Sequence, residues 1–538
     1  MTRAGTSTRE RTPAVLTALR IYCLLLLALY LLTPLLSEET TWGVWPITYL
    51  PPVCRWLLAG LAALTCVPVV TEHAARYGSS AFQRLTFHAS RFTQRFSRRT
   101  LFALLSLLSV IPFLLFRIVH TRWGDAYILI NGLAWPDPAL RLTATWQAPL
   151  TVWLHARLWA LGNALFIWPD AWPVYRIVSP LAGALYVYLL LRLADSVGRN
   201  RTEKLLIVGL MGTLGTVQLF FGYAENYTLA AVGILLFLWL SLETLRGRRA
   251  LWQPALALAL TNGLHPSTVV LDPALIFVAW VWVKGEGKGR KGGKEGSGEV
   301  SRWVAAVVQV AVPMMAVALA VVALMELSGH GLATLATTDR PGGGDARWFV
   351  PLTEVSTRWE RYTMFSWAHL RDWLNEQILT APVTLGGLVI VGVSLLAGRK
   401  RAQVLGMNPQ SDTGKLAEAS SDGSAARASE LGIHPQPETR KPADASSDGD
   451  ELVFLAICTG LYWLFTFVWN PDYGGQRDWD LFSLAAIPST LLLARALPRV
   501  LPRRDHLAQA ALMLTAVSAL HTSAWIYQNT LPWEWPTK

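Results

Sequence analysis

Charge is scarce in this sequence. Charged residues make up 15% of the 538 residues, whereas hydrophobic residues make up 52%. A soluble globular protein carries about a quarter charged residues and has few apolar runs that approach twenty residues. Here such runs recur along the chain, for example IYCLLLLALYLLTPLL and WVAAVVQVAVPMMAVALAVVALM. The shortage of charge therefore excludes a soluble globule.

Cysteine is also rare, and the positions of the four cysteines exclude a disulfide framework. Cys23, Cys54, Cys66 and Cys458 lie in or beside apolar runs, where cysteine behaves as a small buried hydrophobic residue. We therefore expect neither disulfides nor a cysteine metal site. The basic segment 1–20 is not followed by a small-residue cleavage site, so we expect a cytoplasmic tail and a retained first helix.

A broad basic surface is missing as well, although the net charge is +11. The basic residues form short clusters between the apolar runs, which is the pattern that the positive-inside bias produces in membrane proteins. Binding to nucleic acid requires a basic face or stripe instead. Nucleic acid is therefore not an expected partner.

The apolar runs predict an all-α polytopic membrane protein. Each run is close to the roughly 20 residues that an α-helix needs to cross a bilayer, and lipid cannot satisfy the polar groups of an open strand. If every basic cluster is cytoplasmic, the sequence predicts about 13 transmembrane helices, with a cytoplasmic N-terminus and an outer C-terminus. The predicted spans are 21–36, 54–71, 101–118, 174–196, 205–222, 227–245, 251–264, 267–283, 303–327, 381–397, 452–469, 481–496 and 506–526.

Two segments leave the span count open. Segment 149–168 is apolar and rich in Trp, but a span there would break the charge pattern, so we expect a helix in the outer interface. The pair 251–264 and 267–283 is interrupted by NGLHPS. Whether both members of this pair cross the bilayer completely is not decided by the sequence.

The spans and loops divide the chain into five regions. Region 398–451 is expected to be a disordered cytoplasmic loop, because it is rich in Ser, Asp, Pro and Ala and lacks apolar residues for a core. The other regions are 1–100, a tail with two additional transmembrane helices; 101–285, a catalytic core with outer loop 119–173; 286–397, further helices with outer loop 329–380; and 452–538, C-terminal helices with outer loop 470–480.

Several ionisable residues fall on the outer side in this topology. They are Asp125, Arg176, Glu225 with Asn226, His265, Arg477, Asp478 and Asp480. Ionisable groups beside hydrocarbon are costly and often mark a functional site. Ordinary structural roles compete with this interpretation: a helix cap for Asp125, a tight turn for Glu225, packing for His265, snorkelling for Arg176, and an Arg–Asp pair in QRDWDLF.

The order of these features resembles the glycosyltransferase C superfamily, in particular its protein O-mannosyltransferase and aminoarabinose-transferase branch. That family carries an acid at the start of its first large outer loop, an interfacial helix opened by a Pro-Pro-Leu-like motif, and an Arg at the start of the next span. The similar places here are Asp125, QAPLTVWL (147–154) and YRIVSPLAGALYVYLLLRLA (175–194). GYAENYTLA looks like the second acidic turn, and LALTNGLHPSTVVLDP looks like the Thr-Lys-Gly segment.

The sequence departs from the family at three of these places. Ala126 follows Asp125 where the family often has an Asp-Glu pair, and Gln147 and Asn262 stand where Lys is expected. A phosphate of the donor would therefore rely on Arg477, His265 or Arg176, with Arg477 as the first choice.

The resemblance implies sugar transfer from a polyprenyl-phosphate donor to a hydroxyl acceptor, which is a protein, a glycan or a lipid. It places the reaction on the extracytoplasmic side of the cell membrane, among membrane lipids. Asp125 would be the general base of an inverting displacement, and Glu225 is the second candidate for a catalytic carboxylate. Asp478, Asp480 and Asn226 would support the site. No metal site is expected from the residues, and use of a divalent metal is left open.

Two other functions remain alternatives. A multi-pass transporter or lipid flippase would place charges within its spans and often shows an inverted repeat. Here the charges lie at span ends, and no internal symmetry is evident. A non-catalytic assembly subunit is the second alternative, and it would tolerate neutralisation of Asp125.

Overall fold

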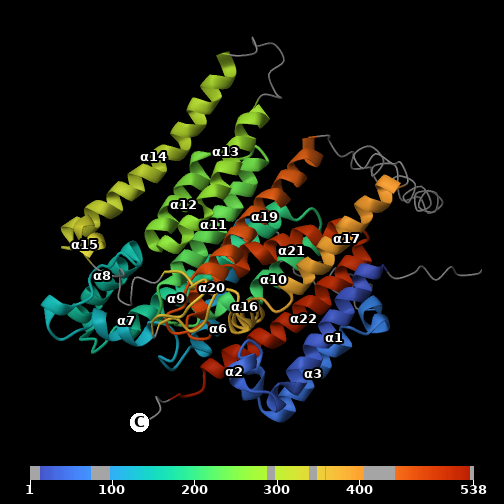
Figure 1. Cartoon of the computed structure of the whole chain (residues 1–538), viewed down its shortest axis with the longest axis horizontal. Coiled ribbons are helices and arrows are strands. Elements are labelled where there is room, and N and C mark those ends of the chain that lie inside the picture. The colour runs from blue at the N-terminus through green and yellow to red at the C-terminus, as the bar shows by residue number, and fades with distance from the viewer. Residues whose placement is uncertain are drawn as a thin grey trace, which may run out of the picture.

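The protein is a bundle of helices in its computed structural model (Figure 1). The structure describes residues 13–73, 97–286, 297–337, 348–357, 359–404 and 443–533. Within these ranges all regular elements are α- or 3-10 helices, apart from one isolated bridge between Phe349 and Trp469. The predicted all-α fold class is therefore confirmed for this part of the chain.

The helices follow one another in this order: α1 (Ala14–Leu32), η1 (Thr33–Leu35), α2 (Glu38–Thr41), η2 (Trp45–Tyr49), α3 (Pro52–Leu64), α5 (Arg98–Leu108), α6 (Val110–Leu115), α7 (Ala126–Leu133), η3 (Pro138–Leu140), α8 (Pro149–Phe166), α9 (Trp172–Val197), α10 (Arg201–Gly212), η4 (Gly215–Phe220), α11 (Tyr227–Leu245), α12 (Trp252–Leu264), η5 (Pro266–Leu271), α13 (Asp272–Glu286), α14 (Ser297–Leu327), α15 (Leu332–Thr337), α16 (Trp367–Thr380), α17 (Thr384–Val404), α19 (Ala443–Val468), α20 (Trp479–Ser483), α21 (Ala486–Val500) and α22 (Arg504–Asn529).

Nine segments in the described part of the chain are long and apolar enough to cross a membrane. They correspond to nine of the predicted spans. The predicted span 381–397 is found in α17, which forms with α16 a pair bent by 97° that would count as a tenth. Multiple apolar helices of this length are typical of a multi-pass membrane protein.

The remaining three predicted spans are short helices in the structure. The helices α3, α10 and α12 have 13, 12 and 13 residues, fewer than the roughly 20 that cross a bilayer unaided. The prediction of one helix over 205–222 is wrong, because α10 ends at Gly212 and a separate 3-10 helix follows from Gly215. Glycines at both sides of the break are poor helix formers. The total of 13 spans stays a prediction.

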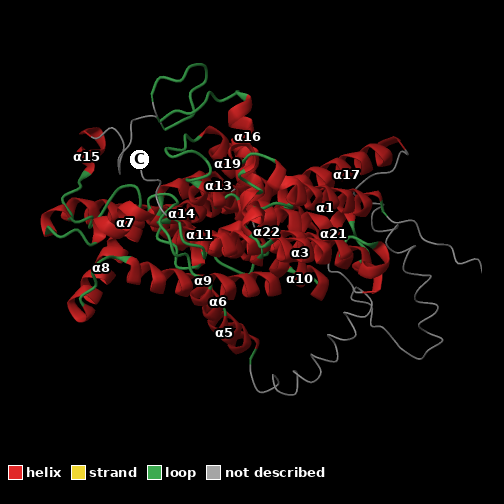
Figure 2. Cartoon of the chain, turned by 90° about the horizontal axis from the view of Figure 1, so that it is seen from below, coloured by secondary structure: helices red, strands yellow, loops and turns green. Residues whose placement is uncertain are grey.

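Short helices and loops gather at one end of the bundle. Figure 1 shows α7, α8 and α15 beside one another there, with α16, α20 and α2 along the same border. We call this border the site end. Seen from the second direction, α5 and α6 project from the body of the bundle below α9 (Figure 2). The predicted interfacial segment 149–168 is α8, which is not among the candidate spans.

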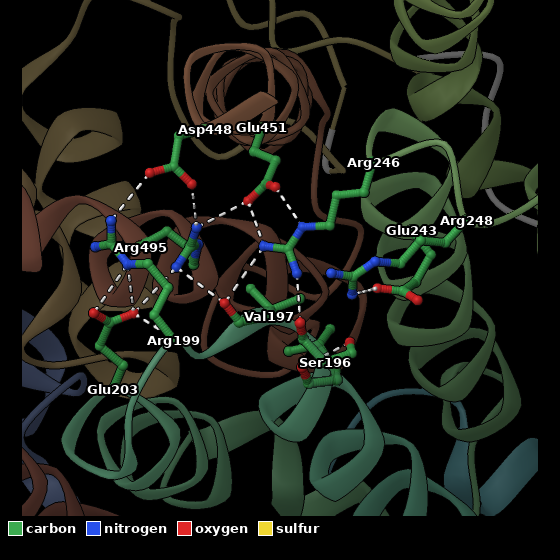
Figure 3. Close-up of polar contacts among 11 residues, drawn as sticks. Ser196, Val197, Arg199, Glu203, Glu243, Arg246, Arg248, Asp448, Glu451 and Arg495 are labelled. Atoms are coloured by element: carbon green, nitrogen blue, oxygen red, sulfur yellow. Dashed lines mark hydrogen bonds and ion pairs between the residues drawn. The ribbon is translucent and has the colours of Figure 1, made fainter. Parts of the chain in front are cut away.

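At the opposite end, buried charges tie five helices together. We call this group the ion network, and it consists of Arg199, Glu203, Arg246, Asp448, Glu451 and Arg495 (Figure 3). Glu451 is fully buried and binds Arg246 at 2.6 Å and Arg495 at 2.9 Å. Arg495 also reaches Asp448 at 3.3 Å and Glu203 at 3.5 Å.

The ion network corrects the prediction that 398–451 is a disordered loop. Residues 398–404 continue α17, and residues 443–451 begin α19, while 405–442 lie outside the described residues. Composition alone missed Asp448 and Glu451, because their partners Arg199, Arg246 and Arg495 are distant in sequence. Three cations face three carboxylates in this network, so its formal charge balances.

Breaking a buried ion pair from one side is costly, because the remaining charge has lost its partner. We expect Glu451→Gln to lower the free energy of unfolding by about 3–5 kcal/mol, since Arg246 and Arg495 both lose a charged partner. Asp195→Asn is the matched control, because its partner Lys204 is only partly buried; it should cost about 1 kcal/mol or less. The measurement is denaturant unfolding in detergent. Equal losses of unfolding free energy in Glu451→Gln and Asp195→Asn would contradict the expected contribution of the ion network to stability.

Candidate active site

Three chain segments far apart in sequence meet at the site end. They are 122–125 before α7, 223–226 before α11, and 473–480 around the start of α20. The N–H of Gly124 donates to the carbonyl of Arg477 at 2.8 Å, and the N–H of Asp125 donates to the Glu225 carboxylate. The predicted acids from three separate regions are thus brought together.

Gly124 is the point of closest approach. Its φ is +49°, a conformation that side chains disfavour. A Cβ there would lie 2.4 Å from Oε1 of Glu225 and 2.7 Å from Oδ2 of Asp480. A side chain at this position would have to displace these two carboxylates, so the two oxygens face the same small space.

Asp125 precedes the first residue of α7 and is only partly buried. The hydroxyl of Tyr473 lies 3.2 Å from its Oδ1 and donates to it. A carboxylate that is held in position yet reachable from solvent has the properties that a general base requires. The structure therefore places Asp125 where the predicted role is feasible.

Glu225 is enclosed more completely than Asp125. It is 2% exposed, and its two oxygens accept the backbone N–H groups of Asp125 and Asn226, the latter at 3.0 Å. Burial, followed by the charges of Asp480 and Asp125, raises the pKa of Glu225 well above its usual value. Both oxygens have a structural task, so this geometry favours a positioning role for Glu225.

The two acids of QRDWDLF hold the loop together. Asp480 is 2% exposed and accepts the Tyr223 hydroxyl at 2.9 Å, while Asp478 accepts the N–H of Tyr473 at 2.8 Å. Burial and the charge of Asp480 raise the pKa of Asp478 well above its usual value. The acids therefore fix Tyr223 and Tyr473 around Asp125 and Glu225.

His265 does not fit the predicted role of a phosphate-binding cation. It is 5% exposed, and its ring lies 4.5 Å from that of Tyr227. Burial lowers the pKa of His265 to about 3, so the ring is neutral near pH 7. Nδ1 accepts the N–H of Ser267 at 3.2 Å, which leaves the proton on Nε2. His265 is thus a neutral donor.

Two arginines occupy other parts of the site end. The Arg477 guanidinium lies 5.0 Å from the ring centroid of Tyr473, whose hydroxyl contacts Asp125. Arg176 stacks on Trp172 at 4.7 Å. Arg477 is therefore on the Asp125 side of the loop cluster, whereas Arg176 lies at the start of α9.

Arg176 has a cationic neighbour that the sequence did not reveal. A Cβ on Gly222 would be 3.6 Å from Cβ of Arg117 and 3.7 Å from Cγ of Arg176, so both arginines flank the GYAENY turn. Nε of Arg176 is buried and has no hydrogen-bond partner among the described residues. Arg117 was overlooked because it lies within the predicted span 101–118, one residue before its end.

An apolar cavity lies next to this arginine pair. It measures about 240 Å³. Phe113, four residues before Arg117, lines it, and so does Phe221, next to Gly222. The rest of its wall is formed mainly by Tyr186, Val187, Leu190, Val217, Thr522 and Ile526.

The sequence also overlooked the tyrosines of the site. Tyr223 and Tyr473 are each within the quoted motifs, but nothing in their spacing distinguishes them from packing residues. In the described part of the chain, no three His, Cys, Asp or Glu side chains are arranged to hold a metal ion.

The buried, neutral state of His265 generates a prediction about pH. Its folded pKa of about 3 lies below the ordinary 6.5, so only the unfolded chain gains the proton as the pH falls from 7 to 5. The folded state should lose about 2 kcal/mol over this interval through His265. We therefore expect His265→Gln to lose less stability than wild type when the pH falls from 7 to 5. The measurement is the melting temperature of each protein in detergent at the two pH values.

The comparison between variants isolates His265 from the acids. Glu225 and Asp478 have raised pKa values and act in the opposite sense, but they are common to both proteins. Substitution of the exposed His73 by Gln is the control and should leave the pH dependence unchanged. Identical pH dependence in wild type and His265→Gln would contradict the prediction.

Comparison of the chain with family models, curated proteins and solved structures found no match.

Proposed function

We propose that this protein is an integral-membrane glycosyltransferase similar in fold to the glycosyltransferase C superfamily, with 13 spans. It would move a sugar from a polyprenyl-phosphate donor to a hydroxyl acceptor on the extracytoplasmic side of the cell membrane, with its N-terminus in the cytoplasm. One observation carries the proposal: Asp125 is a partly exposed acid whose carboxylate accepts the Tyr473 hydroxyl and whose backbone N–H donates to Glu225, at the end where the loops gather.

The proposed reaction is a single displacement. Asp125 takes the proton of the acceptor hydroxyl while the oxygen of that hydroxyl forms a bond to the anomeric carbon. The bond from that carbon to the phosphate oxygen breaks, and the lipid phosphate leaves with the electron pair. A covalent intermediate would need a second free carboxylate, and the occupied oxygens of Glu225 disfavour it for this task. Inversion at the anomeric carbon is the expected outcome.

The leaving group requires positive charge and an apolar site for its chain. Arg117 and Arg176 flank Gly222, and arginine matches phosphate oxygens through several N–H donors. The apolar cavity of about 240 Å³, which Phe113 and Phe221 help to line, would take the first isoprene units. Gly222 continues into Tyr223, which binds Asp480 at 2.9 Å. Tail, phosphate and reacting carbon could therefore follow one path toward the acids, with Arg477 on the far side.

The first prediction concerns the base. We expect Asp125→Asn to lower the rate of sugar transfer by about 10²-fold or more, because an amide cannot accept the acceptor proton. The measurement uses purified protein, a panel of radiolabelled polyprenyl-phosphate sugars and a crude membrane extract as the acceptor source.

The matched control for this experiment is Asp137→Asn, an exposed acid farther along the same loop. It should retain wild-type transfer. If Asp125→Asn transfers sugar at the same rate as wild type, Asp125 is not the base. Absence of transfer from every donor and acceptor tested would count against the enzyme itself.

The second prediction concerns the arginine pair. Loss of a hydrogen bond to a charged group costs about 1.5–3 kcal/mol, so Arg117→Gln and Arg176→Gln should each raise the KM for the donor by roughly 10- to 100-fold. Arg157→Gln is the control, because Arg157 is exposed on α8 and lies over Trp153 at 5.9 Å in a comparable stacking contact. Equal donor KM values in Arg117→Gln, Arg176→Gln and the control Arg157→Gln would refute the assignment of Arg117 and Arg176 to the phosphate.

A further inference from the structure

Two arginines far from the acid cluster share one tryptophan. They lie at the end of the bundle that carries the ion network, which we call the network end. The guanidinium of Arg192, on α9, lies 5.4 Å from the ring centroid of Trp239 on α11. The guanidinium of Arg249, in the turn after α11, lies 5.8 Å from the same centroid. A cation at this distance is attracted by the indole ring, so one ring holds two positive charges near each other.

Neither of these arginines has a carboxylate partner. Arg248, the residue before Arg249, pairs with Glu243 at 3.4 Å. Arg192 donates to the hydroxyl of Tyr188 at 3.3 Å, but no ion pair joins Arg192 or Arg249 to a carboxylate in the described part of the chain. Two neighbouring guanidiniums without a counter-charge from the protein attract an anion from the surroundings.

The tryptophan between them is held by the ion network. Trp239 is 8% exposed and donates its indole N–H to the hydroxyl of Ser196 at 3.1 Å. The carbonyl of Ser196 accepts a hydrogen bond from Arg246 of the network (Figure 3). The ring that supports the two arginines is therefore fixed by contacts within the protein, and its position does not require a ligand.

An exposed apolar stripe on α9 leads to Arg192. Ile177, Leu181 and Leu185 are each about half exposed, and their spacing of four residues places them on one face of the helix. Tyr188 and Arg192 continue this face. Because α9 is long and apolar enough to cross a membrane, hydrocarbon chains are the natural neighbours of the stripe. We call Ile177, Leu181 and Leu185 the α9 stripe.

Arg192 also lies at the depth where the hydrocarbon layer ends. Arg176 is near the start of α9, sixteen residues before Arg192. A helix rises 1.5 Å per residue, so it covers about 24 Å between the two arginines, close to the roughly 30 Å of a hydrocarbon core. With Arg176 at one boundary, Arg192 is at the other, and an arginine side chain is long enough to reach the head groups from there.

We propose that Arg192, Trp239 and Arg249 form a binding site for an anionic phospholipid of the leaflet at the network end. The phosphate lies against the two guanidiniums, whose N–H donors match phosphate oxygens. An acyl chain follows the α9 stripe toward the site end. Basic pockets between membrane helices bind anionic head groups in this way. This site does not depend on the proposed sugar transfer.

Native mass spectrometry of the whole protein in detergent measures this binding. The probes are dioleoyl phosphatidylglycerol, which is anionic, and dioleoyl phosphatidylcholine, which is zwitterionic. Two cations should make wild type bind the anionic lipid roughly tenfold or more tightly than the zwitterionic one. Arg192→Gln and Arg249→Gln should each weaken binding of phosphatidylglycerol by about 10- to 100-fold, through loss of a hydrogen bond to a charged group. Equal affinity of wild type for the two lipids would overturn the proposal.

The matched control is Arg248→Gln. It removes the same charge from the neighbouring position, but from an arginine that already pairs with Glu243. Binding of phosphatidylglycerol should stay close to that of wild type. If Arg248→Gln weakens binding as much as Arg249→Gln does, the lipid responds to the general positive charge of this surface, and the proposed site is wrong.

The melting temperature separates a binding defect from a folding defect. Phosphatidylglycerol should raise the melting temperature of wild type, because a ligand that binds only the folded state stabilises it, and this rise should disappear in both site variants. Arg249 is exposed, so Arg249→Gln should melt at the wild-type temperature when lipid is absent. A lower melting temperature of Arg192→Gln with lipid binding retained would show a structural role and overturn the proposal.

Glycerol phosphate distinguishes a lipid from a soluble phosphate ester, because it carries the head-group phosphate without acyl chains. If the α9 stripe contributes, glycerol phosphate at the same concentration should leave phosphatidylglycerol bound. Displacement of the lipid by an equal concentration of glycerol phosphate would assign the two arginines to a soluble anion and overturn the lipid site.

Discussion

The close approach of Gly124 to two carboxylates is the constraint on which the site depends. Because Gly124 has no side chain to displace Glu225 or Asp480, segment 122–125 can lie against the start of α20 and the GYAENY turn at once. The hydrogen bond from Asp125 N–H to Glu225 then fixes the start of α7. Any larger residue at Gly124 would separate the proposed base from the residues that orient it.

The charges of the protein serve different purposes at its two ends. In the ion network the carboxylates are matched by arginines, so burial is compensated and five helices are held in place. At the site end Glu225, Asp478 and Asp480 crowd together, and their partners in the contacts described above are backbone N–H groups and tyrosine hydroxyls. Carboxyls in that setting keep their protons more readily. Burial raises the pKa of Glu225 and of Asp478, and oxygens of both accept backbone N–H groups. The partly exposed Asp125, whose carboxylate accepts the Tyr473 hydroxyl, is therefore the proposed group for proton exchange with a substrate.

The sequence predicted the parts of this arrangement that depend on local pattern. Runs of apolar residues identified nine spans, the loops between them located Asp125 and Glu225, and the start of a span located Asp480. It could not separate Glu225 from Asp125 in role, because only the fold shows that both oxygens of Glu225 bind backbone N–H groups. Composition misjudged Glu451, since its pairing with Arg246 spans 205 residues. Charge alone likewise suggested His265 as a cation, whereas burial makes it neutral.

Access to the site follows from what surrounds it. The apolar cavity lies between α6, α9 and α22, and α5 and α6 project from the bundle beside α9 (Figure 2), so an isoprenoid chain would approach from the side of the bundle. Arg117 and Arg176 flank Gly222, which follows Phe221 of the cavity wall. A lipid-linked donor of the proposed kind would therefore approach the two arginines from the side of the bundle, whereas a polar acceptor would approach the partly exposed Asp125 from the end where the loops gather.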